Sequence, residues 1–402
     1  MSDSKQLLYF MKKFSIKKLS TLSQTSLAMV SKIVEQMELA VKSWTGCKET
    51  VLHISKQFPK GNGYHHIVEE IKQTFENQTK IGKHYTFTIG SRVFNIHLIK
   101  PALQEDVKIY KKFDKMVFKI YIWLFICNHF ANAMCSPSIT IYVYMTNHKK
   151  KLPIIDHAVV DQINANTAFT SACPLASNEI YIFREEEWFK VLIHESFHAF
   201  GLDFATMQEE DAEKQMFSIF PVMCKLRFYE TYTESWAEII HVIFVSVNTY
   251  PSESMIDIRK LAKIIERNIY NEQIFSMFQC TKVLQHMGLK YRQLYEMTDQ
   301  AKKLRHERYK EETHVFSYYV LKCIIMFHYN EFIEWCSLYN NGSIQFTKTP
   351  ENIQRLFEFI KARYNSVEYL KTIEIFENWF SAQGVKYEGK MESETMRMSI
   401  SE

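Results

Sequence analysis

WFKVLIHESFHAFG, residues 188–201, is the most informative stretch of the sequence. Its apolar residues predict a buried helix, and Gly201 is a typical residue for ending one. Residues four apart share one face of a helix, so the imidazoles of His194 and His198 are expected to point the same way. Glu195 then lies on the adjoining face of the same helical turn.

The segments around this helix predict an α+β fold that is mainly helical. Residues 139–146 and 179–184 are rich in β-branched and aromatic residues and are expected to form strands. Apolar and polar residues alternate over 85–89 and 93–99 around Gly90, which indicates a β-hairpin. Helical patterns cover residues 21–42, 106–133, 228–247 and most of the chain beyond 251.

These patterns suggest five consecutive regions along the 402 residues. They are a basic N-terminal arm (1–19), a helix plus hairpin (20–100), a core with the active-site helix (101–250), a helical C-terminal lobe (251–385) and a flexible polar tail (386–402). Only 10 Gly and 8 Pro are present, which argues against a turn-rich all-β fold. Apolar runs are shorter than the roughly 18 residues of a spanning helix, so we expect no transmembrane segment.

The charge distribution is even apart from the N-terminus. The formal net charge is +4, and residues 1–20 contain five Lys and one Asp, so the rest of the chain is balanced. Residues 5–18 could therefore contact nucleic acid or an acidic surface, although a solvated terminus is the more economical interpretation.

The eight cysteines form no C-x-x-C pair, and no apolar segment with a cleavage site opens the sequence. Scattered thiols without a secretion signal favour a reducing, cytoplasmic compartment over a disulfide framework.

Two neutral histidines at this spacing can supply two nitrogen ligands to Zn²⁺. A third ligand is expected from residues 233–241, where Glu234 and Glu238 are four apart on one helical face. Glu234 is the favoured ligand, and Glu238 is expected to accept a hydrogen bond from a ligand histidine. Which of the two binds the metal stays open, and Glu230, Asp203 and His241 are weaker alternatives.

These residues carry a family resemblance. The pattern His194-Glu195-x-x-His198, followed by Glu234 and Glu238, resembles the gluzincin zinc metallopeptidases, which have H-E-x-x-H and then E-x-x-x-D on a later helix. Here the last position is Glu rather than Asp. The chain also resembles the predicted metallopeptidases of large nucleocytoplasmic DNA viruses, in segments 139–153, 166–170, 180–201 and 315–322.

The resemblance implies a zincin-like fold and a zinc-dependent endopeptidase. Glu195 would take a proton from a metal-bound water and pass it to the leaving amine. Gluzincins also use a Tyr or His to stabilise the oxyanion, and His314 and Tyr318 are the leading candidates, with Tyr319, His241 and Tyr232 as alternatives. A peptide or protein substrate would lie along an exposed sheet edge.

Other catalytic patterns are missing from the sequence. It contains no G-x-x-x-x-G-K-[ST] phosphate loop, no dinucleotide fingerprint and no G-x-S-x-G elbow, so no nucleotide cofactor is expected. The alternative to a peptidase is a catalytically inactive, metallopeptidase-like structural or interaction protein. The viral resemblance implies that such an inactive protein could be a component of the virion. It also implies that the protein could be packaged in a virion rather than stay in the cytoplasm.

Overall fold

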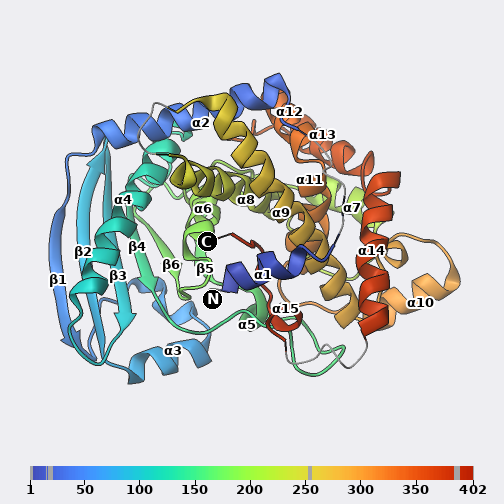
Figure 1. The fold of residues 1–402 in the computed structure, drawn as a ribbon, viewed down its shortest axis with the longest axis horizontal. Coiled ribbons are helices and arrows are strands. Elements are labelled where there is room, and N and C mark those ends of the chain that lie inside the picture. Colours follow the sequence, from blue (N-terminus) through green and yellow to red (C-terminus); the bar gives the residue numbers. More distant parts are fainter. Residues whose placement is uncertain (1–2, 15, 17–20, 252–255, 384–389, 402) are drawn as a thin grey trace.

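The computed structural model describes residues 3–14, 16, 21–251, 256–383 and 390–401, and its fold is helix-rich α+β (Figure 1). Six strands form one mixed sheet in the order β1-β2-β3-β4-β6-β5. They are β1 (Lys48–Ser55), β2 (Lys80–Ile89), β3 (Arg92–Pro101), β4 (Ser138–Tyr144), β5 (Ala168–Thr170) and β6 (Asn178–Ile182).

The sheet contains both antiparallel and parallel strand pairs. The hairpin β2–β3 and the pair β1–β2 are antiparallel, whereas β3, β4 and β6 run parallel to one another. β5 pairs antiparallel with β6 and forms a short edge strand. The predicted hairpin and the two predicted strands are confirmed, but β1 and β5 were not anticipated because neither has a strong alternating pattern.

The expected division at residue 100 falls inside this sheet. Residues 93–99 of β3 pair in register with residues 138–144 of β4, so the region 20–100 and the region 101–250 share one layer. Hydrogen bonds between strands far apart in the sequence therefore join two regions that local patterns had separated.

Fifteen α-helices are described. They are α1 (Asp3–Met11), α2 (Gln24–Ser43), α3 (Glu69–Asn77), α4 (Val107–Phe130), α5 (Gln162–Ala165), α6 (Trp188–Ala199), α7 (Glu210–Ile219), α8 (Phe228–Thr249), α9 (Ile258–His286), α10 (Asp299–Arg308), α11 (Lys322–Phe327), α12 (Tyr329–Tyr339), α13 (Pro350–Lys361), α14 (Val367–Gln383) and α15 (Met391–Glu394). Shorter helical turns are η1 (Asn62–His66), η2 (Tyr291–Leu294) and the π-helical η3 (Phe316–Leu321).

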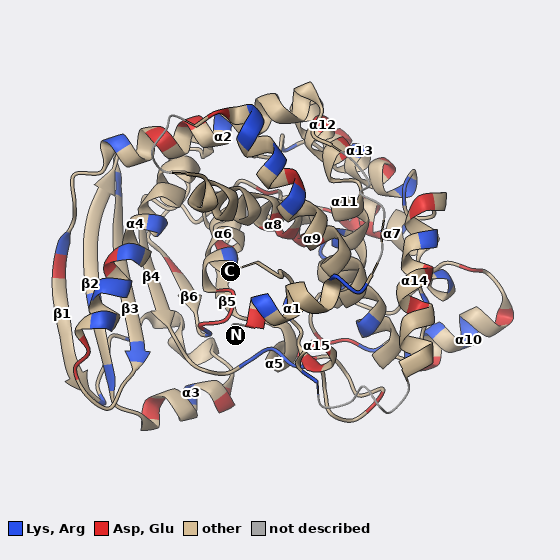
Figure 2. Cartoon of the chain, viewed as in Figure 1, with Lys and Arg blue, Asp and Glu red and all other residues tan. Residues whose placement is uncertain are grey.

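The two faces of the sheet pack against different elements. Ile96 and Leu98 of β3 join the large apolar core, which also contains the buried faces of α4 and α6. On the opposite face, Tyr142 and Tyr144 of β4 pack with Phe75 of α3 in a smaller core. α4 buries one face and carries several Lys residues, which colour parts of its ribbon blue in Figure 2. α6 stands between the sheet and α8 and is buried along almost its whole length (Figure 1).

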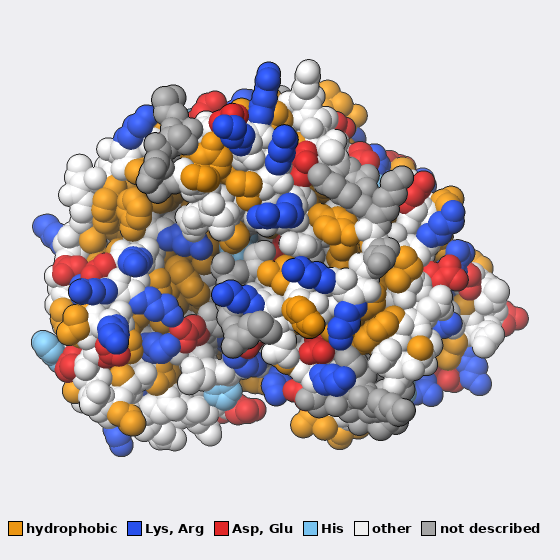
Figure 3. All heavy atoms as spheres, in the orientation of Figure 1, with side chains coloured by type: hydrophobic (Ala, Val, Ile, Leu, Met, Phe, Trp, Pro, Cys, Tyr) orange, Lys and Arg blue, Asp and Glu red, His pale blue; other side chains and the backbone are white. Residues whose placement is uncertain are grey.

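The N-terminal arm is partly ordered against the fold. Leu7, Phe10 and Met11 of α1 are buried in the main core, because α1 is an amphipathic helix. Lys5, Lys12 and Lys13 are exposed, whereas Lys17 and Lys18 lie outside the described residues. On the face drawn in Figure 3, basic and acidic side chains are interspersed.

One cysteine pair corrects the expectation of free thiols throughout. Cys135 and Cys173 form a disulfide, with Cα atoms 4.6 Å apart and a sequence separation of 38. The disulfide joins the loop before β4 to the loop between β5 and β6. The Cys173 amide also donates a hydrogen bond of 2.9 Å to the carbonyl of His198, which connects the second loop to the end of α6. Six cysteines are free.

The end of the chain also differs from the expected flexible tail. Residues 384–389 and 402 lie outside the described residues, but 390–401 are placed and largely buried. Within the described part of the chain, no helix has both the length and the apolar character needed to cross a bilayer.

Candidate metal centre

The side chains of His194, His198 and Glu230 converge on one point. The two Nε2 atoms are 3.1 Å apart, and Oε2 of Glu230 lies 3.0 Å from Nε2 of His194 and 3.4 Å from Nε2 of His198. All three side chains are buried, and they are the cluster among the described residues whose ligand atoms could hold a metal ion together. Two imidazoles and one carboxylate are a ligand set used by catalytic zinc sites.

The Nδ1 atom of each ring contacts a different carboxylate. Nδ1 of His194 lies 2.9 Å from Oε2 of Glu234, and Nδ1 of His198 is hydrogen-bonded to Asp203. Thr233 Oγ1 donates a further hydrogen bond of 3.1 Å to Asp203. In the neutral form of each ring, these acids favour the proton on Nδ1, so that Nε2 would be the nitrogen available to a metal ion.

The structure differs from the sequence analysis in the role of the two glutamates. Glu234 was expected beside the metal, but the carboxylate next to both Nε2 atoms belongs to Glu230, one helical turn earlier. The pattern E-x-x-x-E fits residues 230–234 as well as 234–238. Only the way α6 and α8 pack selects between these registers, because contact between two helices depends on their relative height and rotation.

Glu238, the residue expected to orient a ligand histidine, lies farther along α8. Its carboxylate pairs with Lys322 at the start of α11, and both side chains are buried. The orienting contact expected from Glu238 is made by Glu234 instead. The other oxygen of Glu234 forms a buried ion pair with Lys190, which lies one turn before His194 on α6.

Glu195 borders the same space. It is buried, and burial raises the pKa of its carboxyl group, which the two adjacent histidines partly counteract. Glu195 and His194 line a cavity of about 50 Å³ together with residues 165–168, which lead into and begin β5. This volume can hold ordered water beside the candidate ligands, but it is smaller than a typical small-molecule site.

The two leading oxyanion candidates take different places. Tyr318 lines the cavity, and its ring centre is 5.9 Å from that of His194. It lies on η3, and π-helical turns are frequent at functional sites. His314 does not line this cavity and instead contacts the carbonyl of Lys225 at 3.1 Å.

The alternatives to these two residues are engaged elsewhere. The hydroxyl groups of Tyr319 and Tyr232 donate to the carbonyls of Met396 and Ile344, and Nδ1 of His241 lies 3.4 Å from Ser399 Oγ.

The electrostatics fit a cation-binding role. Burial alone would disfavour a charged His194, but hydrogen bonds to Glu230 and Glu234 outweigh it and raise the pKa of His194 to about 9. Burial also opposes ionisation of Glu230, yet the two histidines hold its pKa well below the usual range. The centre therefore gathers negative charge that protons or a metal ion can neutralise.

Three contributors had weak or no sequence signals. The sequence favours Glu234 over Glu230 as a ligand, it indicates Asp203 only as an alternative metal ligand, and no local pattern marks Lys190. An acid one helical turn before Glu234 was visible in the sequence, whereas the partnership of Lys190 with Glu234 depends on packing between two helices.

Comparisons with known proteins give no relative from which to transfer a function. No family model, no curated protein and no solved structure matches the chain.

Proposed function

We propose that this protein is a zinc-dependent peptidase in which His194, His198 and Glu230 bind the metal. The observation that carries the proposal is the convergence of both Nε2 atoms and one Glu230 oxygen within hydrogen-bonding range of each other. Side chains that share one metal ion bring their ligand atoms to a common point in this way, and the acids at both Nδ1 atoms support the assignment.

These three side chains would hold the zinc ion, and a water molecule would complete its ligand set. Zinc would supply Lewis acidity there and lower the pKa of the bound water towards ~7. Glu195 would accept the proton of that water and deliver it to the leaving amine, and its raised pKa suits both roles. Tyr318, which lines the cavity, would donate its hydroxyl proton in a hydrogen bond to the developing oxyanion.

A zincin-like fold and membership of the gluzincin group belong to the same proposal. The relevant acidic pair is Glu230 and Glu234 rather than Glu234 and Glu238. In this register the first acid faces the metal position and the second receives the hydrogen bond from His194. β5 is the sheet edge nearest the cavity, and an extended peptide could pair with it by main-chain hydrogen bonds.

Metal analysis combined with peptide cleavage tests the proposal. Purified protein should carry about one zinc per chain. Glu195→Gln should keep the metal and lose cleavage of a peptide library by at least about a hundredfold, because only the proton acceptor is removed. His194→Ala should lose the zinc. Glu210→Gln, at the exposed start of α7, is the matched control and should change neither.

Two results would contradict the proposal. Zinc-loaded protein that cleaves no peptide would favour the metallopeptidase-like structural or interaction protein. Full activity in Glu195→Gln would exclude the mechanism.

A further inference from the structure

The C-terminal segment, residues 390–401, is built into the interior of the fold. α1 and this segment lie near the middle of the view in Figure 1. Residues 394–396 run antiparallel to 150–152, with hydrogen bonds from the Leu152 amide to the Glu394 carbonyl (2.8 Å) and from the Met396 amide to the Lys150 carbonyl (3.0 Å). Residues 396–400 are almost completely buried.

The helical side of the fold holds the segment by its carbonyl groups. Carbonyl groups within residues 392–398 accept hydrogen bonds from four buried side chains: Gln279, Lys282, Tyr319 and Lys322. Because these contacts are to the main chain, they fix the path of the segment whatever its side chains are.

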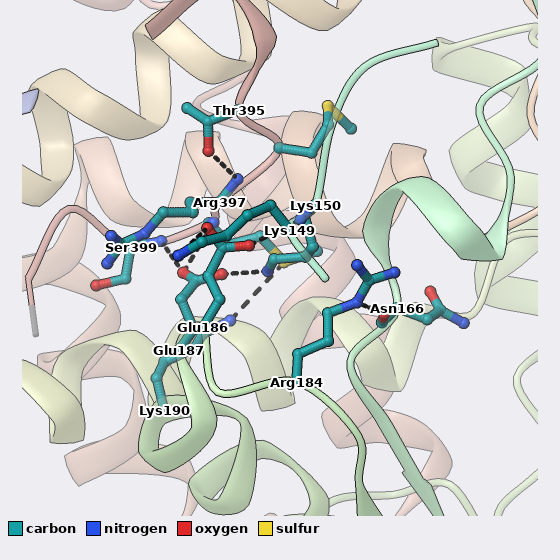
Figure 4. A network of polar contacts seen from close by, with 12 residues as sticks. Lys149, Lys150, Asn166, Arg184, Glu186, Glu187, Lys190, Thr395, Arg397 and Ser399 are labelled. Carbon is teal, nitrogen blue, oxygen red and sulfur yellow. Dashed lines mark hydrogen bonds and ion pairs between the residues drawn. The ribbon is translucent and has the colours of Figure 1, made fainter. Parts of the chain in front are cut away.

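Two buried acids hold the amide groups. Glu187 accepts from the amides of Met398 (3.0 Å) and Ser399 (2.6 Å), and Glu272 accepts from the amides of residues 400 and 401. Figure 4 shows Glu187 between Lys150 and the segment that carries Arg397 and Ser399. The ion pair of Glu187 with Lys150 neutralises the buried carboxylate at this point.

This anchoring brings Met398 to the candidate active site. Its sulfur lies 3.7 Å from Nζ of Lys190, and its side chain lines the cavity that His194 and Glu195 also line. Met398 is separated from these residues by about two hundred positions in the sequence. Apart from Met398, the apolar side chains that line the cavity are small or rigid, namely Ala165, Ala168, Val191 and Tyr318.

We infer that the C-terminal segment is a specificity element of the proposed peptidase, and that Met398 limits the side chain accepted beside the scissile bond to a small one. The inference rests on the proposed function. Its physical basis is the small volume, about 50 Å³, of the cavity that Met398 lines together with His194 and Glu195. Main-chain hydrogen bonds on both sides of Met398 hold this residue in place beside the cavity.

Cleavage profiles of two methionine variants test this inference. Met398→Ala removes three heavy atoms next to the cavity, so large residues such as Leu or Phe should gain about tenfold in relative kcat/KM at one substrate position. Met396→Ala is the matched control. It removes the same atoms two residues earlier, from a side chain that is fully buried but does not line the cavity, and it should leave the profile unchanged.

The profile would be measured on a mixed peptide library, with zinc content and thermal melting of each variant recorded alongside. An unchanged profile in Met398→Ala, or the same change in Met396→Ala, would overturn the inference while wild-type cleavage still supports the proposed function. Absence of wild-type cleavage would remove both. Met398→Val, a smaller reduction, replaces Met398→Ala if that variant shows no cooperative melting, and it should shift the profile in the same direction.

Discussion

Oε2 of Glu234 lies 2.9 Å from Nδ1 of His194, on the side of the ring that faces away from the candidate metal position. The contact favours the Nδ1-protonated tautomer and leaves Nε2 free for a metal ion. Lys190 pairs with the other oxygen of Glu234, so one helix supplies both the histidine and the cation that holds its partner acid. α6 and α8 thus form a connected ionic network beside the site.

The roles of the two glutamates predict different losses of metal affinity. Glu230→Ala removes a candidate ligand and should weaken zinc binding more than Glu234→Ala. Glu234→Ala removes only the orienting acid, which is typically worth 10- to 100-fold in affinity. Competition with a chromophoric chelator measures both constants. A larger loss of zinc affinity in Glu234→Ala than in Glu230→Ala would indicate that Glu234 binds the metal.

Breaking the ion pair between Lys190 and Glu234 should be costly. Lys190→Met leaves a buried carboxylate without its cation, and removing one partner of a buried pair typically lowers the free energy of unfolding by about 3–5 kcal/mol. The double variant Lys190→Met/Glu234→Gln should regain much of that loss, because no charge is left uncompensated. Urea unfolding of the metal-free protein gives the values.

An exposed ion pair provides the comparison for this experiment. Lys214 and Asp211 lie 3.7 Å apart, with 78% and 96% of their side chains exposed. Lys214→Met should therefore change the free energy of unfolding by less than about 1 kcal/mol. Equal effects at Lys190 and Lys214 would show that the buried pair does not support the fold.

The Cys135–Cys173 disulfide should stabilise the fold measurably. For a sequence separation of 38, loop-closure entropy predicts about 4 kcal/mol of stabilisation. The double variant Cys135→Ala/Cys173→Ala should melt at a lower temperature, whereas Cys47→Ala, at a free half-buried thiol, should not. Alkylation of the unreduced, unfolded chain should label six thiols, and labelling of all eight would contradict the disulfide.

The buried carboxyl group of Glu209 should make the free energy of unfolding depend on pH. Burial raises the pKa of this carboxyl group to about 8. Hydrogen bonds from the amides of Phe228 and Tyr229, at the start of α8, lower the pKa but do not cancel the effect of burial. The folded state therefore keeps a proton that the unfolded chain releases near pH 4.5. This group's contribution makes the free energy of unfolding fall as the pH rises from about 5 to about 8.

Glu209→Gln should flatten that part of the profile, because an amide oxygen still accepts from both backbone amides but does not titrate. Guanidinium unfolding at several pH values measures it. The exposed neighbour Glu210→Gln serves as the control. A slope that is unchanged in Glu209→Gln would show that Glu209 is ionised in the folded protein at neutral pH.

Local sequence patterns predicted features that lie within a single helix or hairpin. The spacing of His194 and His198 placed both imidazoles on one helical face, and the alternation around Gly90 gave the β2–β3 hairpin. These inferences held because helical and strand periodicities are properties of a few consecutive residues. The catalytic role of Glu195 remains a prediction on the same basis.

Contacts between residues of different helices and strands depend on tertiary packing. The choice of Glu230 over Glu234 depends on how far α6 and α8 slide along each other, which no single helix encodes. The Cys135–Cys173 bridge and the insertion of Met398 join segments that are distant in the sequence. Such contacts depend on the packing of the whole chain, because their energy comes from burying and pairing groups that local periodicity cannot bring together.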